Sequence, residues 1–132
     1  MAFLTEAGDR IFFGNGSAEL GGRARTALSS QAQWLLSHPQ YAVRIEGHSD
    51  DPPLRPEDQE ALSEKRAEAV RQRLIEEGVP AERVEIVPWG REQRIAECDS
   101  AECSAQNRRA ITRLVIEGAA AKDQRPDLGG GR

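Results

Sequence analysis

The sequence lacks any apolar run that approaches the roughly 18–20 residues needed to cross a bilayer as a helix. It also lacks an excess of positive charge: its formal net charge is -4, so it has no basic field of the kind that attracts nucleic acid. No signal peptide is visible, because Met1–Leu4 is followed at once by Thr5 and Glu6. These absences predict no transmembrane segment in this chain and no nucleic-acid partner.

The motifs of common catalytic and nucleotide-binding sites are missing as well, since the chain has no G-x-S-x-G, no P-loop and no G-x-G-x-x-G. His48 lies beside Asp50 and Asp51, a grouping that a metal or general-base site would use. The other histidine, His38, lies in a segment predicted to end a helix, so no further histidine ligand is expected. We therefore predict a binding domain that is not an enzyme and uses no cofactor or metal, and we interpret His48 as a packed turn residue.

Two cysteines, Cys98 and Cys103, lie five residues apart in a polar stretch. Two thiolates alone do not complete a tetrahedral zinc site, and the spacing differs from the C-x-x-C of redox pairs. Two interpretations stay open. One is a local disulfide, which would indicate an oxidising compartment, and the other is a pair of free thiols.

The length of 132 residues, with 38% hydrophobic residues, suits one domain with a two-layer core. Apolar residues alternate at strand spacing in some stretches and recur at helix spacing in others. Strands are predicted at 10–13, 41–46, 84–87 and 110–116, and helices at about 22–37 and 58–77. A long polar loop is expected between the last two strands. This order predicts an α+β sandwich, with helices on one face of a mixed four-stranded sheet and parallel strands joined through helices.

The densest polar group, at 46–51, follows a predicted strand, and ligand sites favour the carboxyl ends of strands in such sheets. Asp50 lies in this group. On the next helix, Gln59, Leu62 and Arg66 are spaced to share one face. Asp50 and Arg66 suit a ligand that carries both an ammonium group and a carboxylate, with the guanidinium gripping the carboxylate as a fork. Spacing alone allows equally that the two form an ion pair that pins the loop to the helix.

A second polar cluster, Gln106–Arg109, leads into the last predicted strand. Strand alternation points Arg108 and Arg109 to opposite faces. One of them would then join an anion-binding pocket while the other faces solvent. The alternative is that both are solvated.

Three separated motifs, Ile45–Asp51, Leu62–Val70 and Ala105–Ala110, resemble in sequence and order the OmpA-like peptidoglycan-binding domains, most closely the peptidoglycan-associated lipoproteins. Residues 8–13 resemble the entry into the first strand of that family. The resemblance implies a βαβαββ domain over 9–117, with 1–8 as a lead-in and 118–132 as a disordered tail or linker. It implies non-covalent binding of the diaminopimelate in the cell-wall stem peptide, and a periplasmic domain whose parent protein is associated with the outer membrane.

By the same resemblance, Asp50 takes the amino group of the ligand, and Arg66, helped by Arg108, takes the carboxylate. The other residues that the resemblance implies at the pocket are Asn15, Gly16, Gln59 and Leu62. This sequence departs from the family at Gly14, at Gln59 and in the proline-rich loop 51–56, which has one extra residue before Arg66. These departures leave a second hypothesis, a protein-interaction domain of the same fold that binds a Tol-system partner and has weakened or lost ligand binding.

Overall fold

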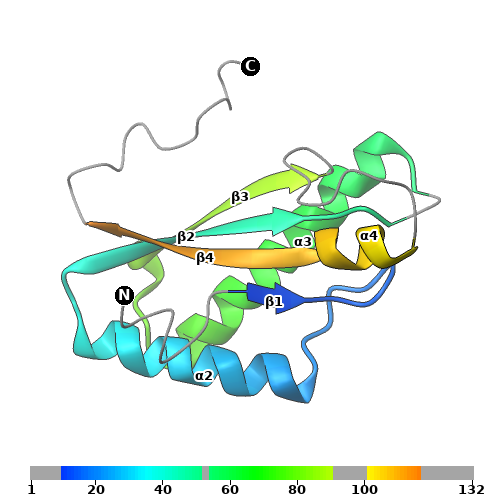
Figure 1. Ribbon diagram of the computed structural model, residues 1–132. Helices are drawn as coiled ribbons and strands as arrows, with labels where there is room; N and C mark the ends of the chain where they lie inside the picture. Colours follow the sequence, from blue (N-terminus) through cyan, green and yellow to red (C-terminus); the bar gives the residue numbers. More distant parts are fainter. Residues whose placement is uncertain (1–9, 52–53, 91–100, 117–132) are drawn as a thin grey trace.

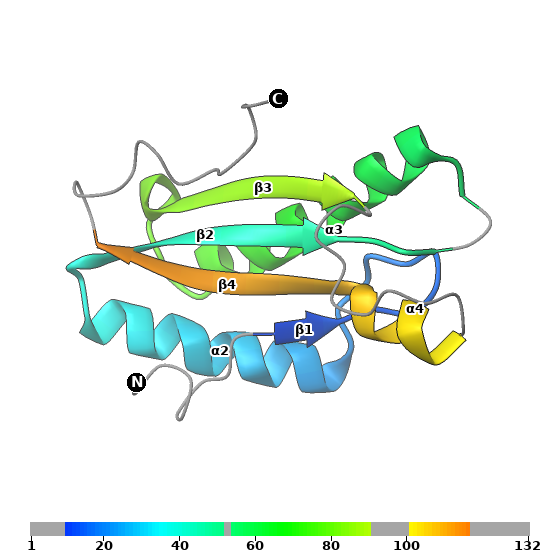
Figure 2. The ribbon, with the colours of Figure 1, turned by 45° about the horizontal axis from the view of Figure 1, so that its top comes forward.

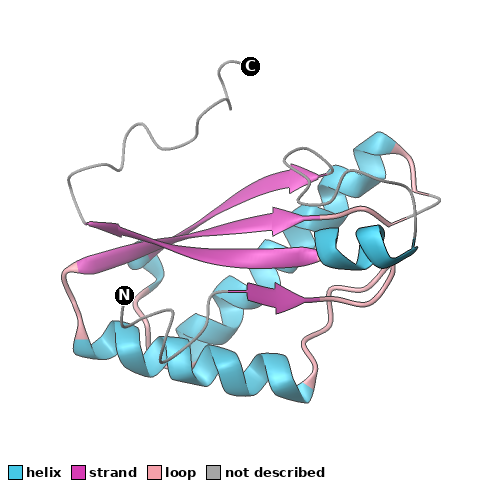
Figure 3. Cartoon of the chain, in the orientation of Figure 1, coloured by secondary structure: helices cyan, strands magenta, loops and turns pink. Residues whose placement is uncertain are grey.

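A computed structural model describes residues 10–51, 54–90 and 101–116, with the backbone alone at 101–103 and 116. Along the chain the elements are β1 (Arg10–Phe12), α2 (Gly22–Ser37), β2 (Tyr41–His48), α3 (Pro56–Glu76), the 3-10 helix η1 (Ala81–Arg83), β3 (Val84–Gly90), α4 (Ala101–Asn107) and β4 (Arg109–Ile116). The strands form one sheet in the order β1-β4-β2-β3, and α2 and α3 cover one of its faces (Figures 1 and 3). The predicted α+β sandwich with a mixed four-stranded sheet is confirmed.

The sheet combines both kinds of strand pairing. β2 pairs with β3 in parallel, while β4 runs antiparallel to both β1 and β2. The connection through α3 therefore joins parallel neighbours, as expected. The connection through α2 does not, because β4 lies between β1 and β2. β4 is the last strand in the chain and pairs with β1. This pairing brings the segment before β4 next to the loop that follows β1.

The core lies between the sheet and the two long helices. Its most deeply buried apolar side chains come from every layer and include Leu28, Ala32 and Leu35 of α2, Val43 and Ile45 of β2, and Val70 and Leu74 of α3. The helical spacing of the sequence had placed these α2 and α3 residues on inward faces. Gly78 ends α3 with a φ of 111°, a conformation that glycine adopts at little cost. The amide of Val79 then donates to the carbonyl of Leu74.

Gly47 determines how closely β2 approaches α3. A Cβ atom at this position would lie 2.0 Å from the carbonyl oxygen of Ser63 and 3.1 Å from the Cβ of Ala67. No side chain fits such a gap, so the backbone of β2 packs directly on the helix. This contact lies just before the loop of Asp50 and Asp51 and fixes where that loop begins.

Apart from shifts of one or two residues at the ends of β1, α3 and β4, three features differ from the sequence-based prediction. β2 extends through His48, beyond the predicted end at 46. β3 extends through Gly90 and includes Pro88, which is tolerated because β3 is an edge strand. α4 occupies part of the stretch predicted as a loop, and Figure 2 shows it at the end of the sheet where β2 and β3 finish.

Some predictions fall outside the described residues. They concern Cys98 and its pairing with the side chain of Cys103, the lead-in at 1–8 and the tail at 118–132. Within the described part of the chain, no helix is both long enough and apolar enough to span a membrane.

Candidate ligand-binding site

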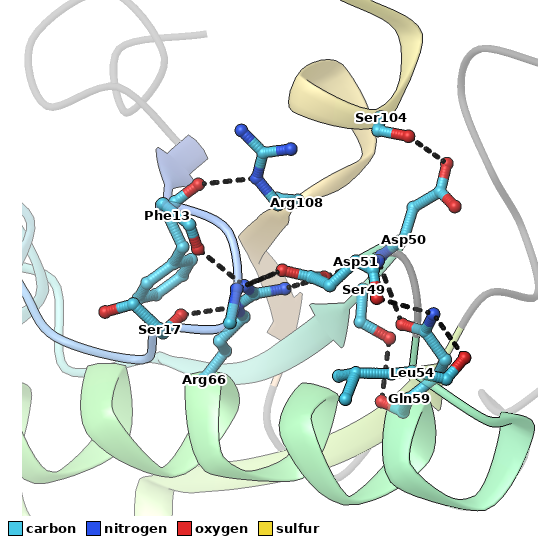
Figure 4. Close-up of polar contacts among 12 residues, drawn as sticks. Phe13, Ser17, Ser49, Asp50, Asp51, Leu54, Gln59, Arg66, Ser104 and Arg108 are labelled. Atoms are coloured by element: carbon cyan, nitrogen blue, oxygen red, sulfur yellow. Dashed lines mark hydrogen bonds and ion pairs between the residues drawn. The ribbon is translucent and has the colours of Figure 1, made fainter. Parts of the chain in front are cut away.

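Four stretches of chain meet beyond the carboxyl end of β2 (Figures 1 and 4). They are the loop between β1 and α2, the loop between β2 and α3, the N-terminal half of α3, and the junction between α4 and β4. Each supplies polar groups to one hydrogen-bonded cluster. The site therefore depends on the tertiary fold, because its members lie up to 95 positions apart in the sequence.

Arg66 lies at the centre of this cluster. Its Nη1 and Nη2 atoms donate to Asp51 at 2.9 and 2.7 Å, in a two-point ion pair whose side chains are both fully buried. The remaining N–H groups donate to backbone carbonyls: Nε to Ser17 at 2.8 Å, Nη1 to His48 at 3.1 Å and Nη2 to Gly14 at 3.0 Å. The guanidinium also lies over the ring of Phe13, 5.2 Å from its centroid.

Asp51, the partner of Arg66, is equally well bonded. Besides the two bonds from the guanidinium, its oxygens accept from the amide of Gly16 at 2.7 Å and from the amide of Asp50 at 2.8 Å. Burial alone raises the pKa of the Asp51 carboxyl. The hydrogen bonds from Arg66, Gly16 and Asp50, with the positive charge of Arg66, outweigh burial and lower that pKa below its ordinary value. Asp51 is therefore ionised at neutral pH.

Asp50 points away from Arg66, toward α4 (Figure 4). Its Oδ2 accepts from Nδ2 of Asn107 at 2.9 Å, and Oγ of Ser104 lies at 3.4 Å. Asp50 is 4% exposed, whereas Asp51 is 0% exposed. The two adjacent carboxylates thus have different neighbours, one a buried guanidinium and the other the polar end of a short helix.

The loop that carries both carboxylates is held against α3 by Gln59. The amide of Asp51 donates to Oε1 of Gln59 at 3.1 Å, and Nε2 of Gln59 donates to the carbonyls of Asp51 at 3.2 Å and Leu54 at 3.4 Å. The Oγ of Ser49 donates to the backbone carbonyl of Gln59 at 2.7 Å. The side chain of Gln59 therefore fixes the loop to α3 through hydrogen bonds at both Asp51 and Leu54.

Arg108 reaches the site from the start of β4. Its Nε donates to the carbonyl of Phe13 at 3.0 Å, and the amide of Phe13 donates to the carbonyl of Arg108 at the same distance. The residue is partly exposed. Among the described residues its two terminal nitrogens have no hydrogen-bond or ion-pair partner, and Figure 4 shows them beyond the bond to Phe13.

The structure brings most of the predicted site residues together. Arg66, Gln59 and Leu62 share the buried face of α3, as their spacing indicated. Gly16 has a φ of 73° and gives its amide to Asp51 rather than to solvent, while Asn15 beside it is exposed. Sequence reasoning missed Asp51, Ser104 and Asn107 as members of the cluster. The 15-residue separation of Asp51 from Arg66 held no signal that distinguished it from Asp50.

Arg109 and His48 belong to the other face of the sheet. Arg109 is 3% exposed. The prediction that it could face solvent is therefore wrong. Burial and the nearby charges of Arg10 and Arg113 lower the pKa of Arg109 to about 10, against the opposing effect of Glu46. His48 is buried, with its Nε2 3.9 Å from Glu46. The residues that the structure describes contain no group of three or more His, Cys, Asp and Glu side chains placed to hold a metal ion.

The sequence pattern that defines the OmpA family matches residues 12–109, a range that contains the whole cluster from Phe13 to Arg108. The chain belongs to the OmpA family. Among curated relatives, the peptidoglycan-associated lipoprotein of Agrobacterium fabrum is 44% identical over 117 residues, which are 89% of this chain and 64% of that protein. The protein of the same name from Pseudomonas aeruginosa is 37% identical over 99 residues, or 75% of this chain and 58% of that one.

Solved structures agree with this family assignment. The crystal structure of the peptidoglycan-associated lipoprotein from Burkholderia pseudomallei aligns with a TM-score of 0.77 at 34% identity, covering 81% of this chain and 90% of that one. The C-terminal domain of MotB from Helicobacter pylori has a TM-score of 0.76 at 24% identity, over 83% and 86% of the two chains, which shows a shared fold. The OmpA-family chain described here spans less than two thirds of the length of the Agrobacterium relative.

Proposed function

We propose that this OmpA-family domain binds peptidoglycan non-covalently, through the diaminopimelate of the stem peptide, and so tethers the cell envelope to the cell wall. Relatives that match 89% of the chain are named peptidoglycan-associated lipoproteins. The proposed location is the periplasm, with the parent protein associated with the outer membrane. The proposed role is binding without catalysis, and Tol-system proteins are proposed as further partners.

The observation that carries this proposal is the cluster of buried carboxylate and guanidinium groups beyond the carboxyl end of β2. The cluster occurs in a chain whose relatives are named peptidoglycan-associated lipoproteins. The side-chain end of diaminopimelate carries an ammonium group beside a carboxylate. Asp50 offers an acceptor for the ammonium group, and the guanidinium groups of Arg66 and Arg108 are the cations of the site. Asn15, Gly16 and Leu62 border it. Each charge-assisted hydrogen bond to such a ligand contributes about 1.5–3 kcal/mol when it is shielded from water.

One observation favours the alternative of a protein-interaction domain. Asp51 and Arg66 are both fully buried and bound to each other, so the centre of the site is closed in this structure. A domain that keeps the fold but has weakened or lost the ligand would have this arrangement. It would then meet a Tol-system partner through its surface.

Sedimentation with insoluble peptidoglycan separates the two functions. The wild-type domain should pellet with diaminopimelate-type peptidoglycan and stay in the supernatant with lysine-type peptidoglycan, whose side chain has no carboxylate. Asp50→Ala should remain in the supernatant. Asp58→Ala, at a side chain 45% exposed on α3, is the matched control and should pellet like wild type. If wild type stays in solution with both materials, the wall-binding proposal fails and the protein-interaction alternative stands.

A further inference from the structure

Two arginines, Arg44 and Arg113, lie directly opposite each other on neighbouring strands. Val43 and Ile45 of β2 belong to the core beneath the sheet, so strand alternation turns Arg44 to the open face, the face away from α2 and α3 (Figure 2). Arg113 of β4 shares that face because the two residues are cross-strand partners. Like charges in this position repel each other, so the arginine pair needs counter-charge.

Glu46 holds both members of the arginine pair, and it does so through their Nε atoms. Its Oε1 accepts from Nε of Arg113 at 2.9 Å, and its Oε2 lies 3.6 Å from Nε of Arg44. The terminal nitrogens of the pair make no hydrogen bond to any residue that the structure describes. Nη1 of Arg44 is buried, and a buried donor without an acceptor is unfavourable. The Arg113 side chain is 50% exposed, so an acceptor from outside can reach the pair.

The strands around the pair carry an excess of positive charge. Arg10 of β1 and Arg109 of β4 lie on the same open face as the pair. The strand carboxylates of this face are Glu46 and Glu85, and Glu85 lies opposite Arg44 on β3. The described strands therefore place four guanidinium groups beside two carboxylates, which leaves two positive charges. Burial and the charges of neighbouring arginines lower the pKa of Arg109 to about 10, as expected where cations are crowded.

We propose that Arg44 and Arg113 bind a phosphate group on the open face of the sheet, at a site separate from the ligand-binding cluster beyond β2. Planar guanidinium groups match the oxygens of a phosphate, and each can donate two parallel hydrogen bonds to it. A phosphate monoester carries about 1.5–2 negative charges at neutral pH, which matches the excess positive charge of this face. Glu46 orients the pair and leaves its terminal nitrogens for the ligand. The phosphate comes from a soluble phosphate ester or from the headgroup of an anionic lipid.

Isothermal titration calorimetry of the whole chain with inorganic phosphate, at constant ionic strength, tests the site. Arg44→Gln and Arg113→Gln should each weaken phosphate binding about tenfold, because each removes one guanidinium fork. Arg55→Gln is the matched control, since Arg55 is 71% exposed on a different element, and it should bind like wild type. Sodium acetate should bind at least about tenfold more weakly than phosphate. Equal affinity of wild type and either pair variant, or of acetate and phosphate, would overturn the inference.

Vesicle sedimentation separates the two sources of the phosphate. Wild type that pellets with phosphatidylcholine vesicles containing phosphatidic acid, but not with phosphatidylcholine alone, takes the lipid headgroup, and Arg113→Gln should then stay in solution. Wild type that binds inorganic phosphate but neither kind of vesicle takes a soluble phosphate ester. Binding to neither phosphate nor vesicles would overturn the inference. Arg113→Gln should still pellet with insoluble peptidoglycan, so the wall-binding proposal stands or fails independently of this site.

Discussion

Asp51 and Arg66 meet side by side, with Oδ2 of the carboxylate 2.7 Å from Nη2 and Oδ1 2.9 Å from Nη1, and neither side chain reaches solvent. Taking two charges out of water is costly, and their attraction offsets that cost only when the other polar atoms are bonded too. Here backbone groups satisfy the rest: the amides of Gly16 and Asp50 on the acid and three carbonyls on the base. The pair is therefore a structural centre as well as a part of the site.

The first prediction concerns the stability of this centre. Arg66→Lys should reduce the free energy of unfolding by roughly 2–4 kcal/mol, near the ~3–5 kcal/mol typical for losing one partner of a buried ion pair. Lysine keeps the charge but offers three donors in place of five. Urea unfolding followed by circular dichroism measures the change. Arg55→Lys, at a side chain 71% exposed, should change stability by less than about 0.5 kcal/mol. A loss below about 1 kcal/mol for Arg66→Lys would show that the network is less rigid than its geometry indicates.

The second prediction is a pH dependence that belongs to Asp51. Because its pKa is lowered in the folded state, its ionised form stabilises the fold at neutral pH. This stabilisation is lost as the pH falls through the unfolded-state value of about 3.9 and below it. Asp51→Asn removes the titrating group, so the gap in stability between wild type and variant should be widest near pH 7. It should narrow as the pH falls from about 5 to 3.

Unfolding by urea at a series of pH values measures that gap. Glu46 also has a lowered pKa: burial raises it, but the neighbouring His48 and the bound Arg113 lower it by more. It is present in both proteins, so the difference between them isolates Asp51. Asp58→Asn, at an exposed position, should follow the wild-type curve. A gap that stays constant over the whole range would mean that Asp51 is not the source of acid sensitivity.

Much of this architecture follows from local sequence patterns. The 3.6-residue period of α3 correctly placed Gln59, Leu62 and Arg66 on one buried face. Such patterns could not tell whether Asp50 or Asp51 pairs with Arg66. Adjacent loop residues are distinguished by the path of the backbone, which is set here by hydrogen bonds to Gln59 and Gly16. α4 was missed because it is short and polar, with little apolar periodicity of its own.

The edge of the sheet shows the same limit. Pro88 indicated the end of a strand, since proline cannot donate to a neighbouring strand. In the structure β3 has its hydrogen-bonded partner, β2, on one side only, so the missing donor costs little and the strand continues to Gly90. Whether a strand lies at the edge of a sheet depends on the tertiary fold. The residues near Pro88 alone therefore could not show that β3 continues.

The third prediction tests the contact between β2 and α3. Gly47→Ala should destabilise the domain strongly, by at least about 3 kcal/mol, because the new Cβ would overlap the carbonyl of Ser63 and force backbone to move. Gly22→Ala, at the first residue of α2, is the matched control, since nothing lies within 4 Å of a Cβ there. It should be neutral or slightly stabilising. Thermal unfolding of the two variants beside wild type gives the comparison. Equal melting temperatures for the two variants would mean that β2 and α3 move apart easily.

The fourth prediction concerns the hydrophobic core. Leu74 of α3 is 0% exposed and belongs to the core cluster between the sheet and the long helices. Leu74→Ala should cost about 2–5 kcal/mol, because truncation removes buried methyl groups and leaves a cavity. Leu36→Ala makes the same chemical change at a side chain 46% exposed, and its cost should stay below about 1 kcal/mol. Denaturant unfolding with equal slopes for both variants would attribute the difference to the folded state. A cost under about 1 kcal/mol at Leu74 would mean that the helix face was wrongly assigned to the core.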